Sequence, residues 1–175
     1  MKKRLELEVI VKKFGYKIIA VTESWTTPEI NDCELSLEGF VLFRKDRNEI
    51  KHGKGGGALL YVSNDIKCVA IDKLNHLKCE SLWVELQEHT GASLTLAVCY
   101  RSQSAAYSEI REMFAAIGQA SKGRCLIVGD FNYPTKVINW DVLEGNNKDE
   151  EEFLDVLQDN FLLQHVDGPR DGNII

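Results

Sequence analysis

A chain of 175 residues is long enough for one domain with a hydrophobic core and too short to predict two. Its apolar fraction of 44% and charged fraction of 27% are those of an ordinary globular domain, and no apolar run is long enough for a membrane span. The net charge of −6 argues against a generic basic coat for nucleic acid, but not against an enzyme that binds nucleic acid in one groove.

The cysteines and the N-terminus indicate an intracellular protein. The five cysteines are odd in number, form no C-x-x-C pair and mostly lie in apolar runs. This pattern favours small buried hydrophobes in a reducing compartment over disulfides or a zinc site. The basic start Met1–Arg4 is followed by no apolar signal core. We therefore expect no membrane partner, and a nuclear location stays open without a clear targeting signal.

The first third of the chain predicts a helix followed by strands. The segment before Gly15 fits both periodicities, but two lysines ahead of that glycine favour a helix C-terminus. Residues 17–22 then read as a short buried strand that ends at Glu23. Thr26–Glu29 has capping-box spacing and predicts a helical turn. Residues 40–43 predict a strand, followed by a polar loop over 44–54.

The middle of the chain is rich in strand patterns. Three glycines, Gly55–Gly57, lead into a strand at 58–62, and residues 67–71 are predicted as its hairpin partner. Residues 81–86 alternate and predict a strand with one wetter face. Residues 94–100 are nearly continuous in apolar character, which is typical of a central strand buried on both faces.

The last third alternates helices with one more strand. Tyr107, Ile110, Phe114 and Ile117 form a helical stripe. Residues 125–129 predict a buried strand ending at Asp130. A helix is predicted at 149–158; its predicted inward-facing residues are Phe153, Leu154, Leu157 and Phe161. The sequence thus predicts one layered α/β domain over 1–175, with sheets packed face to face and helices outside.

Two of these strands end in acids, Glu23 and Asp130, and a third ends in Tyr100-Arg101. Carboxylates at the lip of a sheet are suitable ligands for Mg²⁺, and hydroxyl and guanidinium groups bind phosphate. Each has an ordinary alternative, because aspartate after glycine is a common turn residue and a lone glutamate is usually solvated. Three polar strand ends in one small domain favour a site.

Several blocks occur in an order that resembles a known family. They are Ile19–Trp25, Phe43–Arg47, Gly55–Gly57, Ser81–Glu85, Val98–Arg101 and Leu126–Pro134. Together they resemble the endonuclease/exonuclease/phosphatase family, and most of all the apurinic-like endonuclease domain of non-LTR (LINE-type, chicken-repeat and jockey) retrotransposons. The likeness runs along essentially the whole chain, and Gly129–Asn132 is its most specific part.

The resemblance implies a four-layer sandwich in which two mixed β-sheets are flanked by helices. It implies that Glu23 binds the metal, Mg²⁺ or alternatively Mn²⁺. Asp130 would orient or activate the attacking water, and Asn132 and Tyr100 would hold the phosphate. Arg101 is predicted as a further substrate contact from its guanidinium at the strand end, not from the resemblance. The implied reaction is hydrolytic nicking of DNA. A reverse transcriptase domain in a parent polyprotein is the implied partner.

The sequence also departs from the family pattern. The opening strand with its asparagine and the closing Ser-Asp-His motif have no counterpart, so we expect a domain truncated at both ends. Ser102-Gln103 replaces a proline pair, and Gly168–Arg170 lacks a family threonine. None of the histidines, at positions 52, 76, 89 and 165, is a convincing replacement. An impaired endonuclease is therefore the favoured interpretation, with a non-catalytic nucleic-acid- or protein-binding relic as the alternative and a phosphatase as the third.

Overall fold

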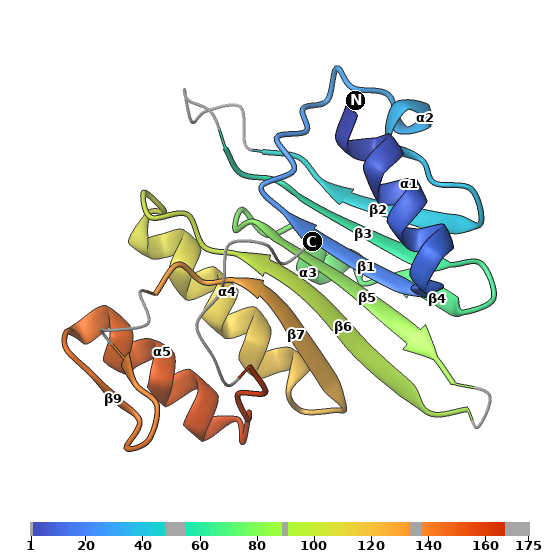
Figure 1. The fold of residues 1–175 in the computed structure, drawn as a ribbon. Helices are drawn as coiled ribbons and strands as arrows, with labels where there is room; N and C mark the ends of the chain where they lie inside the picture. Colours follow the sequence, from blue (N-terminus) through green and yellow to red (C-terminus); the bar gives the residue numbers. More distant parts are fainter. Residues whose placement is uncertain (1, 48–54, 89–90, 134–137, 167–175) are drawn as a thin grey trace.

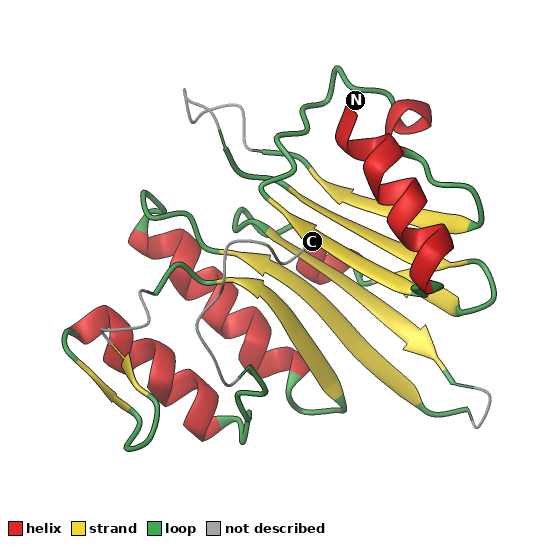
Figure 2. Ribbon diagram, in the orientation of Figure 1, coloured by secondary structure: helices red, strands yellow, loops and turns green. Residues whose placement is uncertain are grey.

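The computed structural model describes residues 2–47, 55–88, 91–133 and 138–166. Two β-sheets stack face to face, and helices cover their outer faces, so the molecule has four layers (Figures 1 and 2). The predicted α/β sandwich is confirmed. Of the sequence features above, His52, His89 and Gly168–Arg170 lie outside the described residues.

The first sheet is antiparallel and has the strand order β1-β3-β2. Its strands are β1 (Ile18–Thr22), β2 (Phe40–Lys45) and β3 (Ala58–Ser63). The N-terminal helix α1 (Lys2–Phe14) covers its outer face and ends at Gly15, whose φ of 66° suits the glycine cap predicted from the sequence. A four-residue helix, α2 (Asp32–Leu35), precedes β2.

The second sheet has the order β4-β5-β6-β7, and only the β6–β7 pair is parallel. Its strands are β4 (Lys67–Ala70), β5 (Ser81–Gln87), β6 (Ser93–Tyr100) and β7 (Cys125–Asp130). Helices α4 (Tyr107–Ala120) and α5 (Lys148–Asp159) cover its outer face, and the short elements are α3 (Asp72–Asn75), β8 (Ile138–Asn139) and β9 (Glu144–Gly145). The parallel pair requires a crossover, and α4 provides it.

Three apolar clusters hold the layers together. Leu60, Val84 and Val98 belong to the cluster between the two sheets. A second cluster, which includes Trp83 and Phe114, joins the second sheet to α4 and α5, and a third joins α1 to the first sheet. Burial of these side chains is the main favourable term in folding. It also fixes how the ends of the two sheets meet.

The predicted hairpin between residues 58–62 and 67–71 is wrong. β3 and β4 belong to different sheets, and β4 pairs with β5. Both edges of β3 are already hydrogen-bonded, to β1 and to β2, so no edge is left for β4. The first sheet is also purely antiparallel, not mixed as the resemblance implied.

Burial differs from the sequence prediction on two strands of the second sheet. One face of β5 was predicted to be exposed to solvent, yet Ser81 and Trp83 are each 0% exposed. The reason is that α3, α4 and the first sheet cover both faces of this strand. β7 was predicted as buried, yet Leu126 is 44% exposed. Within the described residues β7 is an edge strand, paired with β6 alone.

Three smaller expectations also fail. The helical turn predicted at Thr26 begins one turn later, with Asn31 as the cap of α2. Tyr107 and Phe161, expected on inward-facing stripes, are 56% and 92% exposed, because each lies at the end of its helix beyond the packed core. The buried members of the two stripes, Phe114 and Phe153, do stack on each other.

The described residues contain no helix that is both long and apolar enough to cross a membrane. All five cysteines are free thiols. Cys79 and Cys99 are buried, in agreement with their expected role as small hydrophobes, and Cys33 is exposed.

Candidate functional site

Glu23 follows β1 directly and is held in place by its neighbours' backbone. The N–H of Ser24 donates to Gly57 O at 3.2 Å, and the N–H of Trp25 donates to Gly56 O at 2.9 Å. Glu23 and Trp25 have φ values of 53° and 56°, a left-handed conformation that is costly for residues with a side chain. The turn that presents Glu23 is thus specified by pairing with the glycine segment.

The glycine segment rests in turn on a buried carboxylate. Glu80 is 8% exposed and accepts a hydrogen bond from the Gly57 N–H at 3.0 Å. A Cβ at Gly56 would lie 2.8 Å from the same carboxylate, so the backbone approaches Glu80 more closely than a side chain would allow. The Tyr100 N–H donates to the Glu80 carbonyl oxygen at 2.8 Å, so Glu80 also contacts the strand end that bears Tyr100.

Tyr100 joins the two sheets at the site. It is the last residue of β6, and its hydroxyl donates to Glu23 Oε1 at 2.6 Å. Burial raises the pKa of the Tyr100 phenol well above its usual range, and the nearby negative charges of Glu23, Glu80 and Asp130 raise that pKa further. The phenol therefore keeps its proton at neutral pH and acts as a donor.

Asp130 lies beside Tyr100 because the two are register partners across the parallel pair. The preceding residue, Gly129, has a φ of 146°, and a Cβ there would lie 1.8 Å from Cys99 O. Only glycine allows this close approach of the two strands. The Asp130 carboxylate accepts the Asn132 N–H at 2.9 Å, which closes a tight turn after the strand.

Asn132 completes this turn, with a φ of 52°. Its side-chain amide donates to the Arg101 carbonyl oxygen at 2.7 Å, and the Arg101 N–H donates to the Asp130 carbonyl oxygen at 2.9 Å. The chain after β7 is therefore fastened to the chain after β6. These contacts fix the backbone of Asp130 and Asn132 next to Tyr100.

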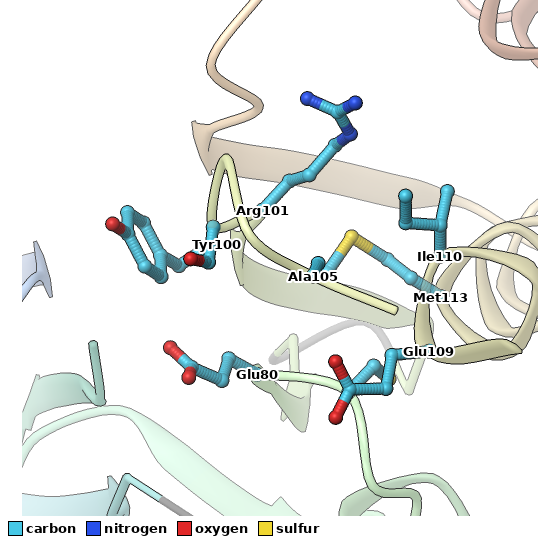
Figure 3. Close-up of a pocket in the computed structure, with 9 residues that line it drawn as sticks. Glu80, Tyr100, Arg101, Ala105, Glu109, Ile110 and Met113 are labelled. Carbon is cyan, nitrogen blue, oxygen red and sulfur yellow. The ribbon is translucent and has the colours of Figure 1, made fainter. Parts of the chain in front are cut away.

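Arg101 points away from Tyr100 (Figure 3). Its guanidinium pairs with Asp149 on α5, donates to Phe131 O at 3.2 Å and lies 4.2 Å from the centre of the Tyr133 ring. Only 12% of this side chain is exposed. The structure thus gives Arg101 partners in the α5 layer, and its predicted contact with substrate stays a prediction.

A small cavity lies behind the site, lined by Cys79, Glu80, Tyr100 and residues of α4 that include Met113 (Figure 3). Its volume is ≈ 10 Å³, about enough for the centre of one water molecule. It is too small to bind a substrate, and Glu23 lies on the exposed side.

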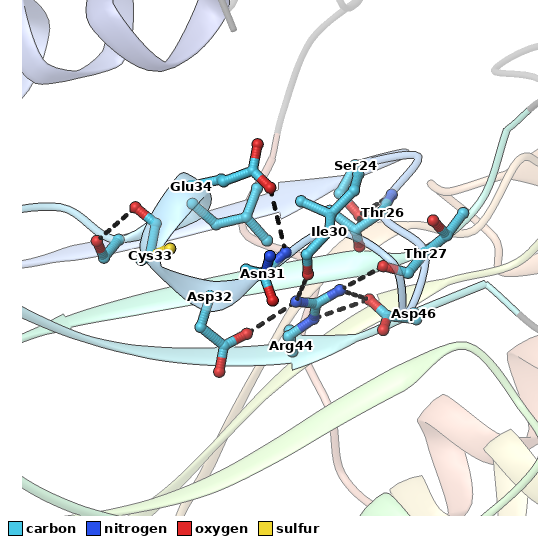
Figure 4. A network of polar contacts seen from close by, with 12 residues as sticks. Ser24, Thr26, Thr27, Ile30, Asn31, Asp32, Cys33, Glu34, Arg44 and Asp46 are labelled. Carbon is cyan, nitrogen blue, oxygen red and sulfur yellow. Dashed lines mark hydrogen bonds and ion pairs between the residues drawn. The ribbon is translucent and has the colours of Figure 1, made fainter.

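A polar network around Arg44 fixes the loop that follows Glu23 (Figure 4). The Arg44 guanidinium donates to Thr27 O at 2.8 Å and to Ile30 O at 2.6 Å, and it pairs with Asp32 at 2.8 Å and with Asp46 at 2.7 Å. Sequence reasoning assigned Arg44 to a polar loop and missed this role. Only Asp46, two positions after Arg44, is close in the sequence; the other partners are 12 to 17 positions away and left no local signal.

The donor set suits a hard cation with a partial water shell. Glu23 and Asp130 both act electrostatically on Tyr100, and β1 lies against β6 and β7. Mg²⁺ keeps several waters and needs one or two protein carboxylates together with substrate phosphate. No group of three His, Cys, Asp or Glu side chains suited to a metal occurs in the part of the chain that is described. The residues therefore fit Mg²⁺ in that mode and do not form a closed protein cage.

Four of the five residues singled out from the sequence meet at one place. Glu23, Tyr100, Asp130 and Asn132 are linked by the contacts above, whereas the Arg101 side chain lies in the next layer. Their chemical roles stay predictions. Sequence reasoning missed Glu80, because its partner Gly57 is 23 positions away. Of the described histidines, His76 contacts Asp72 O at the end of α3 and His165 is exposed.

No protein-family model matches the sequence, and no curated protein matches it significantly. Among solved structures, it is similar to the endonuclease domain of TRAS1, a telomere-specific non-LTR retrotransposon, with a TM-score of 0.61 and 13% identity over 90% of this chain and 64% of that one. It is also similar to ANGEL2, a 2′,3′-cyclic phosphatase, with a TM-score of 0.50 and 14% identity over 76% of this chain and 44% of that one. The chain thus spans less than two thirds of either structure, and its fold is that of the endonuclease/exonuclease/phosphatase proteins.

Proposed function

We propose that this chain is a nuclease-type domain that hydrolyses a phosphodiester of DNA with the help of Mg²⁺, at a reduced rate. The observation that supports it is the meeting of Glu23, Tyr100 and Asp130 at the ends of three strands from two sheets. The similarity in fold to a retrotransposon endonuclease domain is consistent with it.

Each side chain has a defined task in this proposal. Glu23 is the ligand for Mg²⁺, which when bound neutralises charge on the phosphate oxygens. Asp130 orients the attacking water and accepts its proton. Tyr100, which stays protonated, turns its single O–H from Glu23 Oε1 to a phosphate oxygen once Glu23 binds the metal, and the Asn132 amide donates a second hydrogen bond to the phosphate. Mn²⁺ is the alternative ion, since it also prefers oxygen ligands.

The reduced rate follows from the departures noted in the sequence. The closing Ser-Asp-His motif of the resembled family has no counterpart among the 175 residues. One positioned acid or base is typically worth about 10²–10⁴ in rate, so we expect only weak nicking by this chain. In a parent polyprotein the nick would prime a reverse transcriptase, which we propose as the partner, with the nucleus as the location.

A plasmid-nicking assay with Mg²⁺ tests this function. Glu23→Gln and Asp130→Asn should each remove the weak activity, and Glu23→Gln should also weaken Mn²⁺ binding measured by calorimetry. Glu29→Gln is the matched control, because Glu29 is an exposed carboxylate on the same loop. Equal nicking by all four proteins, or equal Mn²⁺ affinity of the wild type and Glu23→Gln, would refute the site.

Two other functions share the scaffold. The likeness to a 2′,3′-cyclic phosphatase favours testing a phosphatase, and release of inorganic phosphate from a monoester without plasmid nicking would select it. Arg101, predicted to contact substrate, is instead paired with Asp149 and only 12% exposed. This pairing favours testing whether the chain is a non-catalytic binding module. Salt-sensitive DNA binding with no metal-dependent cleavage would select that function.

A further inference from the structure

Trp25 is a large aromatic side chain left in solvent beside the candidate site. It is 54% exposed, whereas Trp83 is 0% exposed in the core and Trp140 is partly buried. Trp25 is two positions from Glu23, so their Cα atoms are at most about 7 Å apart. The surface next to Glu23 therefore presents a large aromatic side chain to solvent.

The position of Trp25 is specified, although its ring is open to solvent. The backbone has a φ of 56° and its N–H is bonded to Gly56 O at 2.9 Å. Its indole Nε1 would lie 3.9 Å from a Cβ added at Gly55, so the ring edge rests beside the glycine segment. Left-handed backbone at a residue with a side chain is strained and persists where surrounding contacts enforce it. The backbone of Trp25 is therefore fixed, and its indole lies beside the glycine segment with much of its surface exposed.

We propose that Trp25 is a stacking platform for a nucleobase of the DNA strand whose phosphate lies at Glu23. The inference rests on the proposed function, since it takes the phosphate position from Glu23. Bases in a strand follow one another at about 3.4 Å, and the Cα atoms of Trp25 and Glu23 are at most about 7 Å apart, so a side chain at Trp25 is suited to a base near that phosphate. Stacking on an aromatic face tolerates any base, so the contact provides affinity without sequence preference.

The surroundings favour a nucleobase over an apolar protein partner. The loop after Trp25, Thr27–Glu29, is exposed, and Glu23 on its other side is an exposed carboxylate. Along the described chain around it, Trp25 is thus an exposed aromatic ring flanked by polar groups, which differs from the contiguous apolar patches that mark protein interfaces. A pre-ordered ring also loses little conformational freedom on binding, which raises affinity.

The test compares two labelled single strands of DNA with the full chain, in EDTA and at low ionic strength, by fluorescence anisotropy. One strand has all its bases, and the other has abasic positions at its centre but the same phosphates. The wild type should bind the complete strand about tenfold more tightly, as expected for one stacked base. Trp25→Ala should remove this ratio and Trp25→Phe should keep part of it, with Trp140→Phe as the control.

The outcomes separate the two proposals. Equal binding of both strands by the wild type, or an unchanged ratio in Trp25→Ala, would overturn the stacking role and leave the phosphodiesterase proposal standing. Failure of either strand to bind at low salt in EDTA would overturn the stacking role, while the Mg²⁺-dependent nicking assay separately decides the phosphodiesterase proposal. Circular dichroism of Trp25→Ala shows whether the variant is folded. If Trp25→Ala is unfolded, tryptophan emission decides the question. The complete strand should quench the emission of the wild type more than the abasic strand does, and folded Trp25→Phe should lose this difference.

Discussion

The two halves of the candidate site are fixed by different kinds of contact. The Glu23 arm, residues 23–26, depends on partners far away in the sequence, at Gly56, Gly57 and Glu80. The Asp130 arm, residues 129–132, depends on a local turn and on one neighbouring strand end. The first arm can therefore be loosened without unfolding the sheet, whereas the second is part of the sheet itself.

Gly129→Ala should break the Asp130 arm and the sheet together. Its Cβ would lie 1.8 Å from Cys99 O, and the φ of 146° is unsuited to alanine. Overpacking and strain together cost about 3 kcal/mol or more, which lowers the melting temperature by roughly 10 °C. Thermal unfolding by circular dichroism measures this. The control is Gly123→Ala, where an added Cβ meets nothing within 4 Å; equal melting temperatures for the two variants would contradict the prediction.

Glu80→Ala should loosen the Glu23 arm alone. The Gly57 N–H loses its acceptor in a buried place, at a cost of about 1–3 kcal/mol, and Glu80→Gln should recover part of it by keeping an acceptor. Hydrogen exchange should accelerate at the amides of Ser24 and Trp25 but not at Asn132. Glu85→Gln, on β5 shortly after Glu80, is the control. Faster exchange in both arms would show that the arms are not independent, and faster exchange in neither would show that Glu80 does not hold the Glu23 arm.

Tyr100→Phe should have the smallest effect, because it removes one partly exposed hydrogen bond between the arms, worth about 1 kcal/mol.

The stabilisation by this hydrogen bond also depends on pH. The folded pKa of Tyr100 is raised above its unfolded value of about 10, so this stabilisation is fully present below pH 10 and is lost as the pH rises above it. Urea unfolding should show a constant wild-type advantage up to about pH 9 and a shrinking one as the pH rises above about 10. A constant advantage would mean that the phenol ionises equally in both states. Exposed Tyr16→Phe is the control.

The same contrast explains what could be predicted from the sequence. The central strand β6 and the amphipathic helix α4 were predicted because their patterns are local, and Asp130 was identified from the Gly129–Asn132 block. The partner of β4 was predicted wrongly because strand pairing is decided by which edges remain free. Glu80 and Arg44 were missed because each acts through backbone groups of distant segments, and no spacing rule records such contacts.

The Tyr100–Glu23 hydrogen bond has a consequence for assembly of the molecule. Glu23 follows a strand of one sheet and Tyr100 ends a strand of the other, so neither sheet alone contains both groups. A folding intermediate with a single sheet formed would lack the Glu23–Tyr100 contact, however well ordered it was. Side chains such as Leu60 and Val98, buried between the layers and remote from any chemistry, set the alignment of the two groups. A substitution that changes the side-chain volume at these positions should first displace the Glu23 carboxylate.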